Sequence, residues 1–139
     1  MKKYIVYLLI FTTLFSGYLC SNEYKDIVTV KLKKDETKKI LVISGNSKKL
    51  FKFRWTLYAN NGLVIFRSYD RIVGQNILYL NHKNQSFRVE LTTRGADSYS
   101  VPYILVKFKE FDYETNEAIF QLFLSDRNAK VSLEYLKEN

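Results

Sequence analysis

The sequence is poor in the residues that build cross-linked, metal-binding or catalytic sites. It contains one cysteine, one histidine and one proline in 139 residues. A single sulfur excludes an intramolecular disulfide and a thiolate metal cluster, since each needs at least two cysteines. A single imidazole excludes every site that needs two or three histidines. We therefore expect no metal and no cofactor, and we expect the fold to be stabilised by packing.

Apolar and basic residues, in contrast, are plentiful. Hydrophobic residues make up 47% of the chain and aromatic residues 16%, which is enough for a packed core and excludes intrinsic disorder as the main state. Lys and Arg number 22 against 14 Asp and Glu, so the formal net charge is +8. The length fits one domain, which we place at residues 22–139.

Residues 1–21 have the features of a signal peptide or a membrane anchor. Met1-Lys2-Lys3 supplies a basic start, an apolar stretch follows, and Ser16-Gly17 supplies a boundary of small residues. The run from Tyr4 to Ser21 is uncharged, and its 18 residues are at the lower limit of the length that spans a membrane. We expect the chain to be exported to the periplasm or the cell envelope, with the leader cleaved, retained as an anchor or acylated.

Cys20 stands where a bacterial lipoprotein carries its acylated thiol. The segment Gly17-Tyr18-Leu19-Cys20 resembles a lipobox in part, but that motif calls for a small residue directly before the cysteine, and here the residue is a leucine. The alternative, which we favour, is that Cys20 belongs to a discarded or membrane-buried segment.

The mature part of the chain alternates apolar and polar residues with a period of two, which is typical of half-buried strands. The nine predicted strands span residues 27–34, 39–43, 50–58, 63–69, 77–80, 87–91, 103–108, 118–124 and 130–135. This pattern favours an all-β fold, an antiparallel β-sandwich of the immunoglobulin-like type. A small closed barrel is the alternative that periodicity does not separate from it.

Strand 50–58 shows the clearest alternation. The expected inward side chains are Phe51, Phe53, Trp55 and Leu57, and the expected outward ones are Lys52, Arg54, Thr56 and Tyr58. The Asn61-Gly62 step predicts a hairpin after this strand. Strands 103–108 and 118–124 are apolar on both faces, so we expect them at the centre of a sheet, joined by the acidic loop 112–117.

Basic residues are concentrated between positions 31 and 54. If neighbouring strands bring Lys31 and Lys33 to the sheet face of Lys52 and Arg54, the four side chains form a basic face that attracts an anionic lipid, a glycan or an acidic protein. The alternative is that these lysines keep the strands soluble and block pairing between sheet edges.

The loop at residues 94–100 is a second candidate for binding. It is rich in small residues, and loops at one end of a sandwich commonly carry binding residues. The side chains expected to contact a partner are those of Arg94, Asp97 and Tyr99. The alternative is a flexible connection between the two sheets.

No grouping of residues predicts catalysis. His82 lies in a polar loop without an identifiable nucleophile, and the acidic loop lacks the ligand spacing and the glycine of a calcium site. The sequence has no phosphate-binding loop, no nucleophile elbow and no zinc-protease helix motif. A hydrolase built on carboxylates far apart in sequence, such as Glu90 and Glu110, is the remaining enzymatic alternative.

We therefore expect a non-enzymatic, exported β-sandwich of the bacterial cell envelope that serves as an accessory or structural module and binds a protein partner. A binder of anionic lipid or glycan is the alternative. Nucleic acid is not an expected partner, because the export signal takes the chain out of the cytoplasm. The sequence leaves the oligomeric state open.

Overall fold

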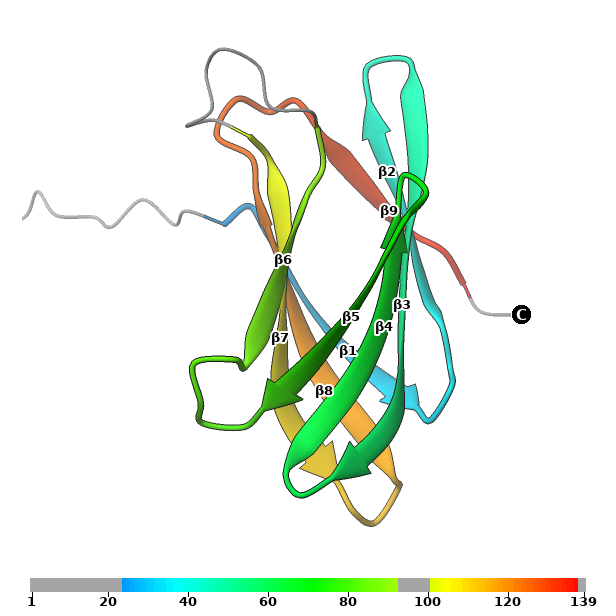
Figure 1. The fold of residues 1–139 in the computed structure, drawn as a ribbon. Coiled ribbons are helices and arrows are strands. Elements are labelled where there is room, and N and C mark those ends of the chain that lie inside the picture. Colours follow the sequence, from blue (N-terminus) through cyan, green and yellow to red (C-terminus); the bar gives the residue numbers. More distant parts are fainter. Residues whose placement is uncertain (1–23, 93–100, 138–139) are drawn as a thin grey trace, which may run out of the picture.

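The computed structural model describes residues 24–92 and 101–137, and these residues form two antiparallel sheets (Figure 1). One sheet has the strand order β1-β8-β7-β6 and the other β5-β4-β3-β2-β9. The strands are β1 (Asp26–Lys33), β2 (Lys38–Ser44), β3 (Ser47–Ala59), β4 (Gly62–Tyr69), β5 (Ile72–Tyr79), β6 (Ser86–Glu90), β7 (Tyr103–Asp112), β8 (Glu117–Ser125) and β9 (Ser132–Tyr135). The prediction of nine strands in an all-β fold is confirmed.

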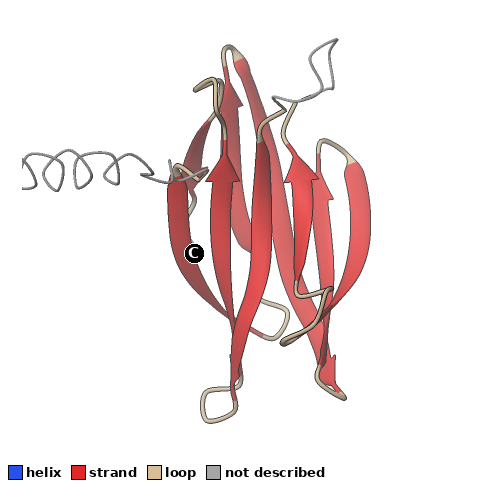
Figure 2. Ribbon diagram, turned by 90° about the vertical axis from the view of Figure 1, so that its left-hand side faces the viewer, coloured by secondary structure: helices blue, strands red, loops and turns tan. Residues whose placement is uncertain are grey.

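Neither sheet closes on itself. β1 and β6 are the edges of the four-stranded sheet, and β5 and β9 are the edges of the five-stranded sheet. The strands run along the length of the domain with loops at both ends (Figure 2). β7 and β8 lie at the centre of their sheet and pair through the acidic hairpin, as predicted. In the part of the chain that the structure describes, no helix has the length and apolar character needed to cross a membrane.

One hydrophobic core lies between the sheets. Phe53 of the five-stranded sheet meets Phe120 of the four-stranded sheet edge to face, with ring centroids 5.4 Å apart, and Phe87 at 6.4 Å. All three side chains are buried. Because alternate residues face the partner sheet along most of the strands, the period-two pattern of the sequence becomes one continuous core.

A β-bulge in β3 changes which side chains face the core. The register with β4 shifts between Trp55 and Leu57, so that one extra residue enters β3. Leu57, expected inside, is 53% exposed, and Tyr58, expected outside, turns inward and packs on Phe111 with ring centroids 4.1 Å apart. The predicted alternation therefore holds up to Trp55, which is in the core, and is wrong beyond it.

β5 begins five residues earlier than the predicted strand at 77–80. It pairs with β4 through a tight turn formed by Asp70 and Arg71, both of which have positive φ angles (49° and 68°). Neither residue is the glycine that usually marks such a turn. The stretch Gly74-Gln75-Asn76 also interrupts the apolar alternation, so the pattern of residues does not indicate a strand here.

Among the described residues, two buried side-chain hydrogen bonds connect the sheets. The indole Nε1 of Trp55 on β3 donates to the carbonyl of Leu32 on β1 over 2.8 Å. The hydroxyl of Tyr69 on β4 donates to the carbonyl of Leu91, directly after β6, over 2.7 Å. Both bonds are buried, so each joins a strand of one sheet to backbone of the other without competition from water.

Because the Tyr69 hydroxyl is buried, we expect the folded state to lose stability at alkaline pH. Burial, with a smaller contribution from the charge of Asp70, raises the pKa of Tyr69 to about 12, whereas an unfolded tyrosine titrates near pH 10. Its stabilising effect is therefore complete below pH 10 and is lost as the pH rises towards 12, by up to about 1.4 kcal/mol per pH unit. At pH 8 we expect Tyr69→Phe to lower the free energy of unfolding by about 1 kcal/mol, because the hydrogen bond to the carbonyl of Leu91 is missing.

Urea unfolding of both proteins from pH 8 to pH 11.5 tests this expectation. The difference between wild type and Tyr69→Phe should shrink above pH 10. A difference that stays constant across this range would show that the Tyr69 phenol titrates alike in the folded and unfolded chains.

Candidate binding face

The four basic residues predicted to share a surface lie in different sheets. Lys31 and Lys33 are on β1 of the four-stranded sheet, whereas Lys52 and Arg54 are on β3 of the five-stranded sheet. All four side chains are exposed, so the two pairs belong to different outer faces. The turn after β1 carries the chain across to the other sheet, a step that periodicity alone does not reveal. A single basic face with these four residues does not exist.

The other predicted contact residues divide into two groups. Arg94, Asp97 and Tyr99, as well as Cys20, lie outside the described residues. His82 is exposed in the loop between β5 and β6, where its Nδ1 accepts a hydrogen bond from the backbone N–H of Asn84 and its ring contacts Tyr79. This imidazole is thus engaged in its own loop.

The acidic residues weighed for catalysis or calcium binding do not gather into one site. The backbone N–H and the hydroxyl of Thr115, with the N–H of Glu114, hold the pKa of Asp112 below its usual value, which stabilises the hairpin turn. Glu90 lies opposite Tyr103 on β7, whereas Glu110 is seven positions further along that strand, about 23 Å away at 3.3 Å per residue. Paired carboxylates for glycoside hydrolysis lie within about 10 Å of each other.

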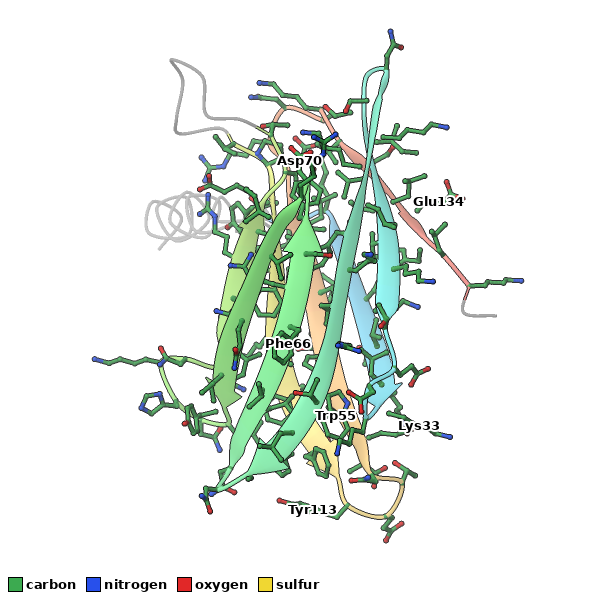
Figure 3. The ribbon with its side chains drawn as sticks, turned by 45° about the vertical axis from the view of Figure 1, so that its right-hand side comes forward. Lys33, Trp55, Phe66, Asp70, Tyr113 and Glu134 are labelled. Atoms are coloured by element: carbon green, nitrogen blue, oxygen red, sulfur yellow. The ribbon has the colours of Figure 1, made fainter. Side chains whose placement is uncertain are left out.

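The outer face of β3, β4 and β5 carries a group of exposed apolar side chains, which we call the apolar patch. Its members are Leu57 (53% exposed) on β3, Phe66 (37%) on β4, and Val73 (74%) and Ile77 (45%) on β5. The strand register connects them, because Val64 lies opposite both Leu57 and Ile77 and is itself partly exposed. Figure 3 shows Phe66 about midway along this face.

Every charge on these three strands is positive. The charged residues of β3, β4 and β5 are Lys48, Lys49, Lys52, Arg54 and Arg67. Arg54 lies opposite Phe66, and Lys52 lies opposite Ser68, which in turn lies opposite Val73. A hollow of about 340 Å³ lies here, with Lys52, Arg54, Phe66 and Val73 in its lining. The face thus combines apolar contact area with two exposed cations, and no carboxylate of these strands neutralises them.

An aromatic cluster at the β3–β4 turn end of the domain is the second candidate surface. Tyr113 is 74% exposed beside a hollow of about 350 Å³. Its hydroxyl lies 3.2 Å from that of Tyr58, and burial together with this contact raises the pKa of Tyr58 to about 12. The Tyr58 ring is stacked on Phe111. Because these ring faces and hydroxyls already contact one another, the cluster has a structural role that accounts for it.

The apolar patch is not predictable from alternation. The alternation predicts Leu57 in the core because it does not reveal the bulge, and Val73 lies outside the predicted strand at 77–80. One available signal was the absence of any acidic residue between positions 47 and 69. Only the pairing of the strands shows that the apolar and basic side chains share a face.

Comparison of the chain with models of protein families, with curated proteins and with solved structures finds no match.

Proposed function

We propose that this protein is an exported, non-enzymatic module that binds a protein partner through the outer face of β3, β4 and β5. The single observation that carries the proposal is the apolar patch beside Lys52 and Arg54. An exposed group of large apolar side chains with polar surroundings is typical of an interaction surface. Export rests on the N-terminal segment of the sequence, and the lack of enzymatic activity rests on the missing catalytic groupings.

The chemistry of the face favours a protein over a lipid surface or a glycan. Leu57, Phe66, Val73 and Ile77 offer contact area on adjacent strands of one sheet, which suits the flat packing of another protein. Lys52 and Arg54 favour an acidic partner and increase the rate of association at low salt. An anionic lipid surface needs many cations on one face, and the separation of Lys31 and Lys33 from this face reduces their number.

We propose a likeness to immunoglobulin-like domains in architecture only. In immunoglobulin constant domains the second and third strands lie in different sheets. Here β2 and β3 pair at seven positions. The likeness is in two antiparallel sheets with loops at both ends, and likeness of fold carries no argument about the partner.

Two charge-reversal variants test the proposal. Lys52→Glu/Arg54→Glu alters the proposed face, and Lys31→Glu/Lys33→Glu makes the same change of net charge on the other sheet. From envelope extracts, the tagged full chain and the Lys31/Lys33 variant should recover the same protein. The Lys52/Arg54 variant and Phe66→Asp should recover it at least tenfold less well.

Equal recovery by all four proteins would contradict the proposed face. Binding to vesicles containing phosphatidylglycerol that depends on Lys52 and Arg54, with no protein recovered, would replace the protein partner by a lipid.

A further inference from the structure

We propose that the edge strand β5 accepts an extended acidic segment of the partner as an additional antiparallel strand. This inference rests on the proposed function and specifies how the partner engages the same face. Edge strands present unpaired backbone donors and acceptors, and addition of a strand is a recurring way of binding an extended segment.

β5 differs from the other three sheet edges of the described chain. β1 carries Lys31 and Lys33, β6 has five residues that include a contacting Arg88–Glu90 pair, and β9 has only four residues. Charges and short length are devices that prevent a sheet edge from pairing with another chain. β5 has eight residues, none of them charged. It is therefore the edge that lacks this protection.

The register of the β4–β5 hairpin shows which backbone groups of β5 point away from the sheet. In a hairpin with a two-residue turn, Ile72 bonds to its partner Tyr69, and inward and outward residues then alternate. Val73, Gln75 and Ile77 consequently direct their N–H and C=O groups outward. The backbone N–H of Tyr79, next in this series, donates to the carbonyl of Asn84, which confirms the outward direction.

The outward backbone groups belong to the same residues as the exposed side chains. Val73 and Ile77 are members of the apolar patch, and Gln75 between them is exposed. A strand added at Val73–Ile77 would make backbone hydrogen bonds to β5 and place every second side chain beside the patch. Affinity would come from backbone pairing, and specificity from these side chains.

Charge identifies the occupant as an acidic segment. Gln75 lies opposite Phe66, which lies opposite Arg54, so an added strand would run about 14 Å from the Arg54 backbone at 4.8 Å per strand. Lys52 and Arg54 line the same hollow as Val73 of β5, so both cations lie on the face that an added strand would border. Their attraction for an acidic strand is strongest below about 0.1 M ionic strength, where the Debye length exceeds about 10 Å. A second copy of this chain is disfavoured, because it brings another net charge of +8 and an equally uncharged β5.

A peptide-binding experiment on the full chain tests the inference. The probe is an end-capped octapeptide of alternating valine and glutamate, compared with the same peptide carrying lysine for glutamate and with a glutamate peptide N-methylated on alternate residues. Gln75→Pro removes one outward N–H without touching the bonds to β4, and Gln75→Thr changes the same side chain while keeping the N–H.

The wild type and Gln75→Thr should bind the glutamate peptide with similar affinity. The wild type should bind the lysine peptide at least tenfold more weakly, and Gln75→Pro should bind the glutamate peptide at least tenfold more weakly. If Gln75→Pro disturbs folding, the N-methylated peptide tests the same backbone hydrogen bonds on the wild-type protein. The wild type should bind this peptide at least tenfold more weakly than the unmethylated glutamate peptide. Analytical ultracentrifugation that shows a dimer lost in Gln75→Pro would overturn the acidic segment in favour of a second copy.

The results distinguish strand addition at β5 from binding through the outer face of β3, β4 and β5. Peptide binding that is lost in Lys52→Glu/Arg54→Glu but unaffected by Gln75→Pro and by N-methylation would overturn strand addition and leave the face intact. Absence of peptide binding, with a partner still captured through the face, would have the same meaning. Loss of both would overturn both.

Discussion

Replacement of Trp55 by alanine should lower the free energy of unfolding by about 3–5 kcal/mol. The side chain is 2% exposed and packs edge to face on Phe111 with ring centroids 5.6 Å apart. Its removal leaves a cavity and also leaves the carbonyl of Leu32 without the indole donor. Domains of this size are stabilised by only about 5–15 kcal/mol, so the variant should be close to unfolding at 37 °C.

Urea unfolding followed by circular dichroism measures this loss, since the variant contains no tryptophan for fluorescence. Leu57→Ala, two residues along the same strand, is the matched control and should change stability by no more than about 0.5 kcal/mol. A loss of 2 kcal/mol or more in Leu57→Ala would mean that β3 has no bulge and that Leu57 is in the core.

Replacement of Asp126 by alanine should lower the free energy of unfolding by about 1–3 kcal/mol. Asp126 is buried directly after β8, and its Oδ2 accepts a hydrogen bond from the backbone N–H of Val131 over 2.8 Å. That bond fixes the connection that carries the chain from one sheet to β9 in the other. Alanine would leave the N–H of Val131 without an acceptor.

Asp126→Asn separates the hydrogen bond from the charge. Asparagine keeps an acceptor for Val131 and removes a carboxylate that Lys25 approaches only to 3.8 Å, so chemical denaturation should show a change below about 1 kcal/mol. If asparagine is as damaging as alanine, the ion pair with Lys25 is the main contribution, and the role given to the backbone bond is wrong.

Much of the fold was predictable because it depends on alternation. The strands of the four-stranded sheet bury alternate residues, with one interruption in β7 where the register shifts between Phe108 and Glu110. β7 and β8, apolar on both faces, are central as predicted. The sequence did not show which strands share a sheet, because alternation specifies faces and not neighbours. For this reason the predicted basic face depends on a pairing of strands that would bring Lys31 beside Lys52, and the structure places these two residues on different sheets.

The candidate site was less predictable than the fold, and for local reasons. A single extra residue in β3 moves Leu57 from the core side to the outer face. A turn formed by Asp70 and Arg71 creates β5 and thus brings Val73 next to the rest of the apolar patch. The turn needs two positive φ angles, for which glycine or asparagine is the usual signal, and here the residues are aspartate and arginine. The extra residue in β3 is a threonine, which is also common in regular strands, so its identity does not mark the bulge.

Residue-resolved amide hydrogen exchange, with and without the alternating valine–glutamate peptide, measures most directly whether an acidic segment pairs with β5 at the edge of the outer face of β3, β4 and β5. The N–H groups of Val73, Gln75 and Ile77 should exchange at least tenfold more slowly with the peptide bound. Those of Gly74 and Asn76, which already face β4, should change little. Protection confined to another edge or loop, with these three amides unchanged, would contradict the account.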